Sequence, residues 1–204
     1  MSPIVVTGTD TGVGKTIFAA ALARALGAAY WKPIQSGLDD ELSDSETARA
    51  LGVRQVLPEA YRFAHPLSPH RAAELAEVVI DPARLSLPIA DALVIEGAGG
   101  LLVPITRSLF FADLFVRWQA RIVLVARTSL GTINHSLLSL EAMRMRGISV
   151  LGIAFVGEPN EDNEATIAAL GDVKRLGRLP HLDGLDAESL AAAFAANFRD
   201  GDFA

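Results

Sequence analysis

The stretch that decides the fold class is Gly8-Thr9-Asp10-Thr11-Gly12-Val13-Gly14-Lys15-Thr16, near the start of the chain. It follows the apolar run Ile4–Thr7 and opens a helix-compatible stretch, Lys15–Leu26. A strand, a glycine-rich turn ending in Gly-Lys-Thr and a helix together form the context of a phosphate-binding loop. Successive backbone N–H groups of such a loop cradle phosphate oxygens, and the helix N-terminus adds its partial positive charge. The sequence therefore predicts a nucleotide site, with Lys15 reaching the outer phosphates and the Thr16 hydroxyl facing Mg²⁺.

The loop departs from the strict phosphate-loop pattern at its first glycine. The pattern would place that glycine one residue later, where the chain has Thr9 after Gly8. The alternative is a glycine-rich turn that binds nothing. Because the Gly-Lys-Thr ending falls where the helix begins, the pattern favours nucleotide binding over a plain turn. Contacts to the nucleotide are expected from Thr11, Gly12, Val13, Gly14, Lys15 and Thr16.

Short apolar runs alternate with helix-compatible stretches along the chain. The runs predict strands at Ile4–Thr7, Ala29–Lys32, Ala92–Glu96, Arg121–Ala126, Val150–Val156 and Arg175–Leu179. Helices are predicted at Lys15–Leu26, Asp44–Leu51, His70–Val78, Phe111–Trp118, Thr132–Arg146, Asn163–Leu170 and Ala187–Phe198. Runs that are continuously apolar are typical of strands in a parallel sheet with helices on both faces. The pattern predicts one doubly wound, mostly parallel α/β domain over residues 1–204, with a frayed tail at Asp200–Ala204.

Composition sets limits on partners and location. The chain of 204 residues carries a formal charge of −6, and its basic residues are dispersed, which argues against nonspecific nucleic-acid binding. Because the chain has no cysteine, disulfides, thiolate catalysis and cysteine-ligated zinc are excluded. No apolar run approaches the roughly 18 residues that a membrane helix needs. No basic segment precedes Ile4 either, so we expect a cytoplasmic protein without a membrane partner.

Three further segments carry functional groups at the ends of predicted strands. They are Trp31–Gly37, Val94–Gly100 and Leu130–His135. The first supplies Lys32 and Ser36, and the second supplies the Glu96 carboxylate followed by three glycines in four positions. Ligands of doubly wound folds gather beyond the carboxyl ends of the strands. These groups are therefore expected in the same crevice as the phosphates.

Four ordered segments resemble those of the dethiobiotin synthetase family: GTDTGVGKT (8–16), KPIQSG (32–37), EGAGG (96–100) and LGTINH (130–135). The segment Phe63–His70, which contains Ser-Pro-His, is similar to a proline-rich segment of that family. The resemblance runs from residue 4 to about residue 180. It implies an ATP- and Mg²⁺-dependent ligase of biotin biosynthesis that joins 7,8-diaminononanoate and CO₂ into dethiobiotin, releasing ADP and phosphate. It also implies a homodimer.

The chemistry that the resemblance implies requires no nucleophile from the protein. One amine captures CO₂ as a carbamate, a carbamate oxygen attacks the γ-phosphoryl group, and the second amine closes the ring on the resulting mixed anhydride. The transition states need charge neutralisation and alignment. By resemblance, Lys15 and Lys32 flank the carbamate and the transferring phosphoryl group as catalytic residues, and Ser36 hydrogen-bonds the amine or the carbamate.

The resemblance further implies a metal site and additional nucleotide contacts. Mg²⁺ is held by Thr16, Glu96 and an acidic residue of the stretch 44–46, in an oxygen-only shell. We favour Asp44 over Glu46 for this ligand, and the alternative is that Asp44 serves only as the N-cap of its helix. Beyond the phosphate loop, nucleotide contacts are expected from Glu96, Gly97, Gly99, Gly100 and Pro180.

The start of the helix predicted after the fourth strand is a candidate anion site. Free N–H groups and the helix dipole favour a carboxylate there. In the resembling family this turn comes from the partner subunit and binds the carboxylate of the substrate. Substrate contacts are therefore expected from Thr132, Ile133 and Asn134 across a homodimer. An ordinary cap by Thr132 is the alternative for that side chain.

The chain departs from the family pattern at the nucleotide base. An asparagine-aspartate pair after the fifth strand binds adenine in the family, whereas this chain has Val156 and Gly157. Asn160 or Asn163 would have to fold back to replace the pair, or backbone groups near Pro180 would read the base. A site without base-edge hydrogen bonds discriminates weakly. The sequence therefore predicts relaxed selectivity, with nucleoside triphosphates other than ATP also supporting the reaction.

Two other functions fit the loop alone. Partition-type and iron-delivery ATPases of the same fold carry a lysine early in the loop, where this chain has Asp10. Amidating enzymes with a similar nucleotide domain need a glutamine-hydrolysing domain with a catalytic cysteine, and this chain has no cysteine. Both are therefore less favoured than the ligase.

Overall fold

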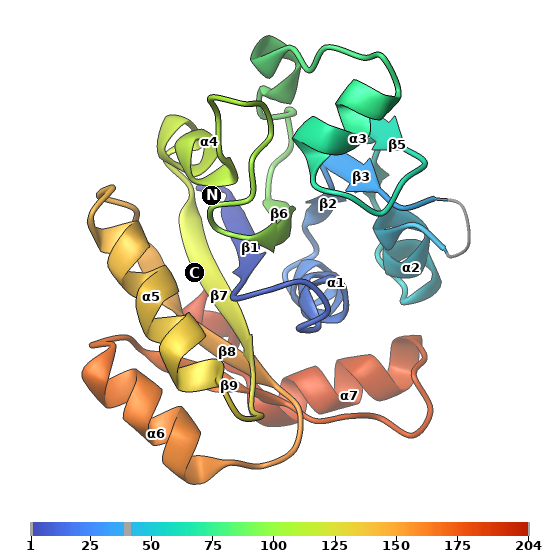
Figure 1. Ribbon diagram of the computed structural model, residues 1–204. Helices are drawn as coiled ribbons and strands as arrows, with labels where there is room; N and C mark the ends of the chain where they lie inside the picture. Colours follow the sequence, from blue (N-terminus) through green and yellow to red (C-terminus); the bar gives the residue numbers. More distant parts are fainter. Residues whose placement is uncertain (1, 39–41, 204) are drawn as a thin grey trace.

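The computed structural model describes residues 2–38 and 42–203. Its main sheet has seven strands in the order β4-β2-β6-β1-β7-β8-β9 (Figure 1). The strands are β1 (Ile4–Gly8), β2 (Ala29–Trp31), β4 (Val56–Leu57), β6 (Leu93–Gly100), β7 (Arg121–Arg127), β8 (Val150–Val156) and β9 (Arg175–Leu179). All neighbouring strands of this sheet pair in parallel. The predicted doubly wound α/β fold is confirmed.

Helices cover both faces of the sheet. They are α1 (Lys15–Ala25), α2 (Asp44–Ala50), α3 (Pro69–Leu75), α4 (Phe111–Trp118), α5 (Thr132–Arg144), α6 (Glu161–Leu170) and α7 (Ala187–Asn197), with 3₁₀ helices η1 (Pro82–Leu85) and η2 (Asp200–Asp202). In Figure 1, α1, α2 and α7 lie on one side of the sheet, and α4, α5 and α6 lie on the other. Within the described part of the chain, no helix has the length and apolar character to cross a membrane.

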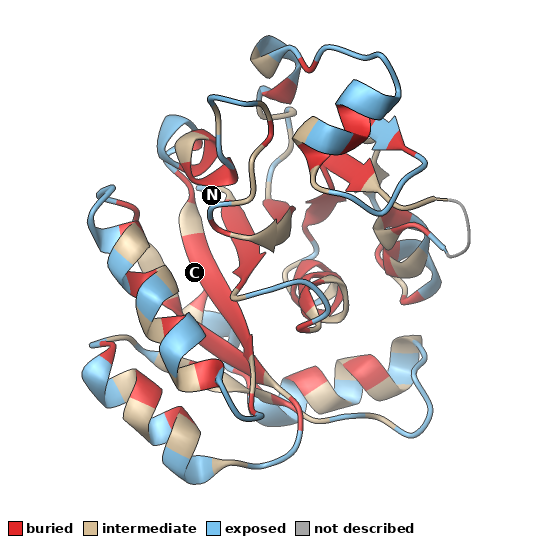
Figure 2. Ribbon diagram, in the orientation of Figure 1, coloured by how far each residue is buried: buried red, intermediate tan, exposed pale blue. Residues whose placement is uncertain are grey.

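The core consists of two apolar layers separated by the sheet. Successive side chains of a strand point to opposite faces, so Val5 packs in one layer while Ile4 and Val6 pack in the other. The central strands are buried on both faces, as their colouring in Figure 2 shows. This double burial explains why their sequences are continuously apolar.

The order of the strands places a crevice at the end of β1. From β1 the chain passes to β2 and β4 on one side of the sheet, and later to β7, β8 and β9 on the other. Such a reversal of strand order opens a ligand crevice beyond the carboxyl ends of the strands. The loop 9–14 leaves β1 at this point and leads into α1.

A small second sheet lies beside the crevice and was not predicted. It pairs β3 (Ile34–Ser36) with β5 (Tyr61–Phe63) in parallel. Each strand has three residues, too few to show a periodic pattern. The pairing fixes the backbone that carries Ser36.

The predicted frayed tail is wrong for residues 200–203. The chain forms η2 there, and the Phe203 side chain is fully buried. Its ring centroid lies 6.4 Å from that of Phe18 and 6.0 Å from that of Phe194. Burial of an aromatic ring stabilises the folded chain enough to outweigh the polar Asp-Gly-Asp that precedes it. Ala204 lies outside the described residues.

Candidate active site

The phosphate loop forms an open cradle of backbone N–H groups at the start of α1. Gly14 is the N-cap of α1 and has a φ of 90°, in the left-handed region that favours glycine. A Cβ atom on Gly14 would lie 2.8 Å from Cγ1 of Val156, so no larger residue fits there without a shift. No side chain caps the N–H groups of this helix. They are therefore available to an anion, as in other phosphate-binding helix termini.

Four predicted site residues from distant parts of the chain meet beside this loop. Oγ1 of Thr16 lies 2.9 Å from Oδ1 of Asp44 and 2.9 Å from Oε1 of Glu96. Nζ of Lys32 lies 2.6 Å from Oδ2 of Asp44 and 2.8 Å from Oε1 of Glu96. Lys32 also donates a hydrogen bond to the Gly97 carbonyl at 3.1 Å. The result is a compact cluster of one hydroxyl, two carboxylates and one ammonium group.

The two lysines of the crevice differ in their electrostatic environment. Burial disfavours the charged form of Lys32, but the Glu96 and Asp44 carboxylates outweigh it and raise the pKa of Lys32. Burial and the nearby Lys32 ammonium lower the pKa of Lys15 from 10.5 to about 8. Nζ of Lys15 donates to the Asp10 carbonyl at 2.8 Å and contacts neither carboxylate. Lys15 therefore lacks an anionic partner of its own within the described residues.

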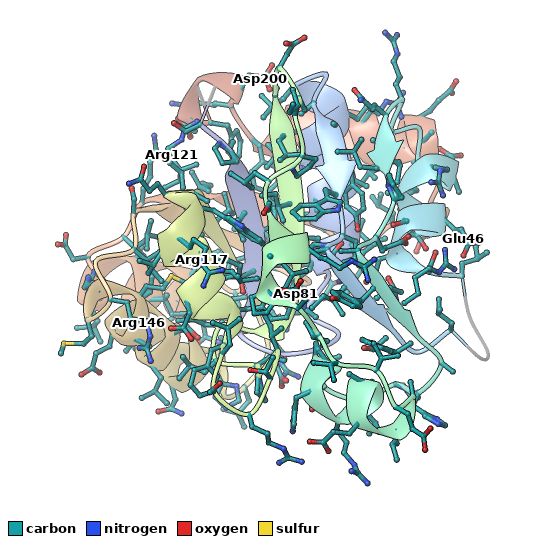
Figure 3. The ribbon with its side chains drawn as sticks, turned by 90° about the horizontal axis from the view of Figure 1, so that it is seen from above. Glu46, Asp81, Arg117, Arg121, Arg146 and Asp200 are labelled. Carbon is teal, nitrogen blue, oxygen red and sulfur yellow. The ribbon has the colours of Figure 1, made fainter. Side chains whose placement is uncertain are left out.

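Asp44 and Glu46 point in different directions. Ser43, not Asp44, is the N-cap of α2, so the interpretation of Asp44 as a helix cap is wrong. The Glu46 carboxylate completes a capping box by accepting hydrogen bonds from the Ser43 backbone at 2.8 Å and hydroxyl at 2.7 Å. Glu46 is exposed, at the outer edge of the molecule in Figure 3. Asp44 instead faces Lys32, whose charge lowers the pKa of the Asp44 carboxyl against the opposing effect of burial.

The donor atoms of the cluster suit a hard divalent cation. A threonine hydroxyl and two carboxylates supply oxygen only, which is the ligand type that Mg²⁺ prefers. Among the described residues, no group of three or more His, Cys, Asp or Glu side chains is arranged to hold a metal. Thr16, Asp44 and Glu96 would supply only part of a metal shell, which phosphate oxygens and water would complete.

Two cavities meet at the phosphate loop and share Gly12, Gly14 and Ile17. The first, of about 620 Å³, extends past Val156 to Pro180. The second, of about 670 Å³, is lined by the predicted Lys15, Thr16, Lys32, Ser36, Asp44, Glu96 and Gly99, and by Pro66–Pro69. Their junction at the loop suits an elongated ligand whose phosphates bridge the two.

Ser36 presents an unsatisfied hydroxyl to the second cavity. Its Oγ atom is buried, with no hydrogen-bond partner among the described residues. Buried polar groups are nearly always paired, so an orphaned one at a cavity wall points to a partner that enters with a ligand.

The two asparagines considered for the base both hydrogen-bond to the protein backbone. The amide groups of Asn160 and Asn163 both donate to the Thr128 carbonyl, at 3.2 Å and 3.1 Å. Oδ1 of Asn160 accepts from the Asn163 backbone and thereby caps α6. Val156, Gly157 and Pro180 line the first cavity as the sequence suggested.

The start of α5 lies outside both cavities. Gly131 is the N-cap of α5, so the cap role considered for Thr132 is wrong. The buried Thr132 hydroxyl donates to the Arg127 carbonyl at 2.5 Å. Ile133 is half-buried and Asn134 is exposed. Within one chain, these three residues are therefore not brought to the crevice.

Tyr30 is a site residue that the sequence did not reveal. Its hydroxyl donates to Oε2 of Glu96 at 2.6 Å, and its side chain is fully buried. Burial and the Glu96 charge raise the pKa of Tyr30 well above its ordinary value, so the phenol stays protonated and donates. The only sequence signal was a tyrosine in an otherwise apolar strand. Gln35 was missed in the same way, although its Oε1 atom accepts from the Asp44 backbone at 3.1 Å.

A phosphate loop at the end of a central parallel strand defines the chain as a P-loop nucleotide-binding protein. The fold is similar to that of the cell division ATPase MinD from Pyrococcus furiosus, with a TM-score of 0.60, 14% identity, and coverage of 100% of this chain and 98% of that one. It is also similar to the septum site-determining protein MinD complexed with Mg-ADP from Pyrococcus horikoshii, with a TM-score of 0.56, 16% identity, and coverage of 95% and 93%. At these identities the likeness establishes the fold alone.

Sequence comparison identifies the family. A family model described as an AAA domain matches residues 2–189. The chain is 60% identical over 206 residues to the ATP-dependent dethiobiotin synthetase of Novosphingobium aromaticivorans, with 100% of each covered. It is 58% identical over 207 residues to the enzyme of the same name from Brucella ovis, covering 100% of this chain and 97% of that one. The chain belongs to the ATP-dependent dethiobiotin synthetase family, which confirms the resemblance found in its motifs.

Proposed function

We propose that this protein closes the ureido ring of dethiobiotin from 7,8-diaminononanoate and CO₂, at the expense of ATP, in biotin biosynthesis. The observation that carries the proposal is the meeting of Lys32, Asp44 and Glu96 with the phosphate loop at one cavity. The identity of about 60% to enzymes named for this product supports it independently.

The proposed reaction proceeds in three steps. One amine of the substrate attacks CO₂ and becomes a carbamate after losing a proton. A carbamate oxygen then attacks the γ-phosphorus of ATP, and the bond to the departing ADP oxygen breaks. The second amine attacks the carbonyl carbon of the mixed carbamic-phosphoric anhydride, loses a proton and expels phosphate. Each step is assisted by alignment and by neutralisation of negative charge, so the protein supplies electrostatics and no nucleophile.

Each residue of the cluster has a proposed part in these steps. Lys15 and Lys32 neutralise charge on the transferring phosphoryl group and on the carbamate. The unpaired Ser36 hydroxyl hydrogen-bonds the amine or the carbamate. Thr16, Asp44 and Glu96 hold Mg²⁺, which supplies charge neutralisation at the phosphate oxygens when bound.

The two cavities suggest how the nucleotide is oriented. We propose that the triphosphate lies on Thr11, Gly12, Val13, Gly14, Lys15 and Thr16, with Glu96, Gly97, Gly99 and Gly100 beside its outer end. The base then extends into the first cavity toward Pro180, and the second cavity receives the diamine. This arrangement is supported by the junction of the cavities at the loop.

We further infer a cytoplasmic homodimer with residues 1–204 acting as one domain. The N-terminus of α5, from Thr132 through Ile133 to Asn134, would contribute to the site of the other subunit and bind the carboxylate of the substrate. The exposure of Asn134 and the distance of these residues from both cavities of their own chain support this arrangement. The cytoplasm is proposed because ATP is supplied there.

The proposal is tested by incubating the purified protein with diaminononanoate, bicarbonate, Mg²⁺ and ATP, and measuring dethiobiotin by mass spectrometry. We expect product that depends on all four components and is absent with Lys15→Ala. The control removes one charge-assisted contact to the transferring phosphate, an interaction often worth a few kcal/mol in the transition state. ATP hydrolysis without dethiobiotin would instead favour a switch ATPase of the same fold.

A further inference from the structure

The Lys32 ammonium group is fully engaged within the ligand-free cluster. It contacts Asp44 at 2.6 Å, Glu96 at 2.8 Å and the Gly97 carbonyl at 3.1 Å. An ammonium group has three protons, and each has one of these acceptors. Lys32 is 4% exposed and Glu96 is 1% exposed, so water competes little for the contact between them, whereas the Asp44 side chain is 29% exposed. Lys32 therefore serves as the counter-ion of two carboxylates, the buried Glu96 and the half-buried Asp44.

The oxygens that Lys32 contacts belong to the same carboxylates that would bind the metal. The Tyr30 hydroxyl holds Oε2 of Glu96 at 2.6 Å, which leaves Oε1 to face both Thr16 and Lys32. A divalent cation at Thr16 would have to share Oε1 with the ammonium group. Like charges that share a buried oxygen repel strongly, because the interior screens them poorly.

The formal charges of the cluster balance before any ligand binds. Asp44 and Glu96 contribute two negative charges, and Lys15 and Lys32 contribute two positive charges when both are protonated. A free divalent cation would add two positive charges to a neutral, largely buried site, which is costly. A metal-nucleotide complex instead brings its own anionic oxygens, which can accept the Lys32 ammonium as the metal takes over the carboxylates.

We propose that Lys32 competes with free divalent cations for Asp44 and Glu96, so that the site selects the metal-nucleotide complex over the free metal. This inference rests on the proposed nucleotide site and assigns Lys32 a role additional to its proposed contact with the carbamate. Removing the lysine charge then strengthens binding of free metal, although it removes a group that turnover requires.

The test measures Mn²⁺ binding to the nucleotide-free protein by electron paramagnetic resonance. We expect Lys32→Gln to lower the Kd for Mn²⁺ at least tenfold, because glutamine can donate a hydrogen bond but carries no charge. Lys15→Gln is the matched control, since it removes the same charge from the same crevice without breaking a contact to either carboxylate. We expect its Kd to stay within about threefold of wild type, as a more distant charge has a weaker effect.

Thermal unfolding provides a second measurement in case the variant is less stable. Mg²⁺ alone should raise the Tm of Lys32→Gln and leave that of the wild type nearly unchanged, because a ligand stabilises the state that binds it. Lys32→Met, which removes the hydrogen bonds of the lysine as well as its charge, should show the same gain. An Mn²⁺ affinity that is equal or weaker in both Lys32 variants would overturn the inference.

The two proposals fail in different ways. The metal measurement contains neither nucleotide nor diamine, so it does not depend on ring closure. If the wild type makes no dethiobiotin but Lys32→Gln shows the lower Kd for Mn²⁺, only the proposed function is contradicted. If the wild type makes dethiobiotin but the Kd for Mn²⁺ does not fall in Lys32→Gln, only the competition between Lys32 and free metal is contradicted.

Discussion

Asp44 and Glu46 lie two positions apart in the chain, yet their carboxylates have opposite environments. Asp44 lies in the crevice beside Thr16 and Lys32. The Glu46 carboxylate lies on the surface and accepts hydrogen bonds from the Ser43 hydroxyl and backbone N–H. The capping box explains the difference, because it fixes the first turn of α2 so that Asp44 faces inward.

This difference predicts separate effects of two conservative substitutions. Asp44→Asn should raise the Mg²⁺ concentration needed for half-maximal activity several-fold, because an amide supplies an oxygen but no charge to a hard cation. Glu46→Gln should leave it unchanged and lower the stability only slightly through the weakened capping box. Mg²⁺ titrations of dethiobiotin formation measure both. The reverse pattern would transfer the ligand role to Glu46.

Lys15 illustrates a cost in stability at a functional position. It is 6% exposed, and its pKa is lowered to about 8 by burial and by Lys32. In the unfolded chain the lysine holds its proton to a higher pH, so the folded state binds fewer protons between about pH 8 and 10.5. Stability of the wild type therefore rises with pH through this window, and the penalty is fully present below pH 8.

Removing this charge should stabilise the nucleotide-free protein. Lys15→Met is expected to raise the Tm at pH 7. The free energy of unfolding should rise by up to about 3 kcal/mol if all of the pKa shift is recovered. The difference from wild type should shrink as the pH rises from 8 toward 10, and stabilisation by added ATP should be lost. Thermal unfolding at several pH values, with and without ATP, measures this. A variant that is less stable than wild type at pH 7 would contradict the role of burial.

At the residue scale, the sequence revealed the polar groups that stand in recognisable motifs. Lys15 begins α1, Lys32 directly follows β2 and Glu96 lies within β6, each in a glycine-containing segment, and the structure brings them to the crevice. Tyr30 and Gln35 were not predicted, because each lies in a short strand where a single polar residue is compatible with ordinary burial. Their role depends on which strands become neighbours, and no local pattern contains that information.

Among the elements, the longer strands and helices were predicted to within a few residues. The failures were β3, β4 and β5, which are too short to carry a pattern, and the 3₁₀ helices η1 and η2, of which η2 has a polar sequence that hid the burial of Phe203. In both cases long-range packing determines the local structure, and propensity alone does not reveal it.

The segment between β8 and α6 predicts how the enzyme treats the nucleotide base. Asn160 of this segment and Asn163 in the first turn of α6 both donate to the Thr128 carbonyl, so neither amide stands in for the asparagine-aspartate pair of the family. We therefore expect CTP, GTP and UTP to support ring closure within about tenfold of ATP in kcat/KM, a difference of about 1.4 kcal/mol or less. Steady-state kinetics with each nucleotide tests this. A preference for ATP above about a thousandfold would reveal a base-reading group.

For the whole molecule, the fold is shared with proteins that carry different names. The MinD structures have a similar fold at 14% and 16% identity, whereas the dethiobiotin synthetases match over the full chain at about 60%. A fold supports many activities, and the groups at the strand ends distinguish them. We propose that Lys32, Asp44 and Glu96 carry that distinction here.

The proposed dimer predicts complementation between two inactive variants. Lys15→Ala disrupts the phosphate loop, and Asn134→Ala disrupts the element proposed to act in the partner subunit. With random subunit exchange, half of the dimers are mixed and each has one intact site, so about a quarter of full activity should return. Activity of the mixture after exchange, proved by mass spectrometry of tagged subunits, measures this. No recovery would place both elements in the site of one subunit.

The most direct test of the central claim follows oxygen from CO₂. In the proposed reaction one carbamate oxygen attacks the γ-phosphorus and leaves with it, while the other stays in the ureido carbonyl. With ¹⁸O-labelled bicarbonate, and quenching before the label exchanges with water, we expect one labelled oxygen in the released phosphate and one in dethiobiotin. Dethiobiotin formed together with unlabelled phosphate would contradict phosphorylation of a carbamate, and phosphate released without any dethiobiotin would contradict the activity itself.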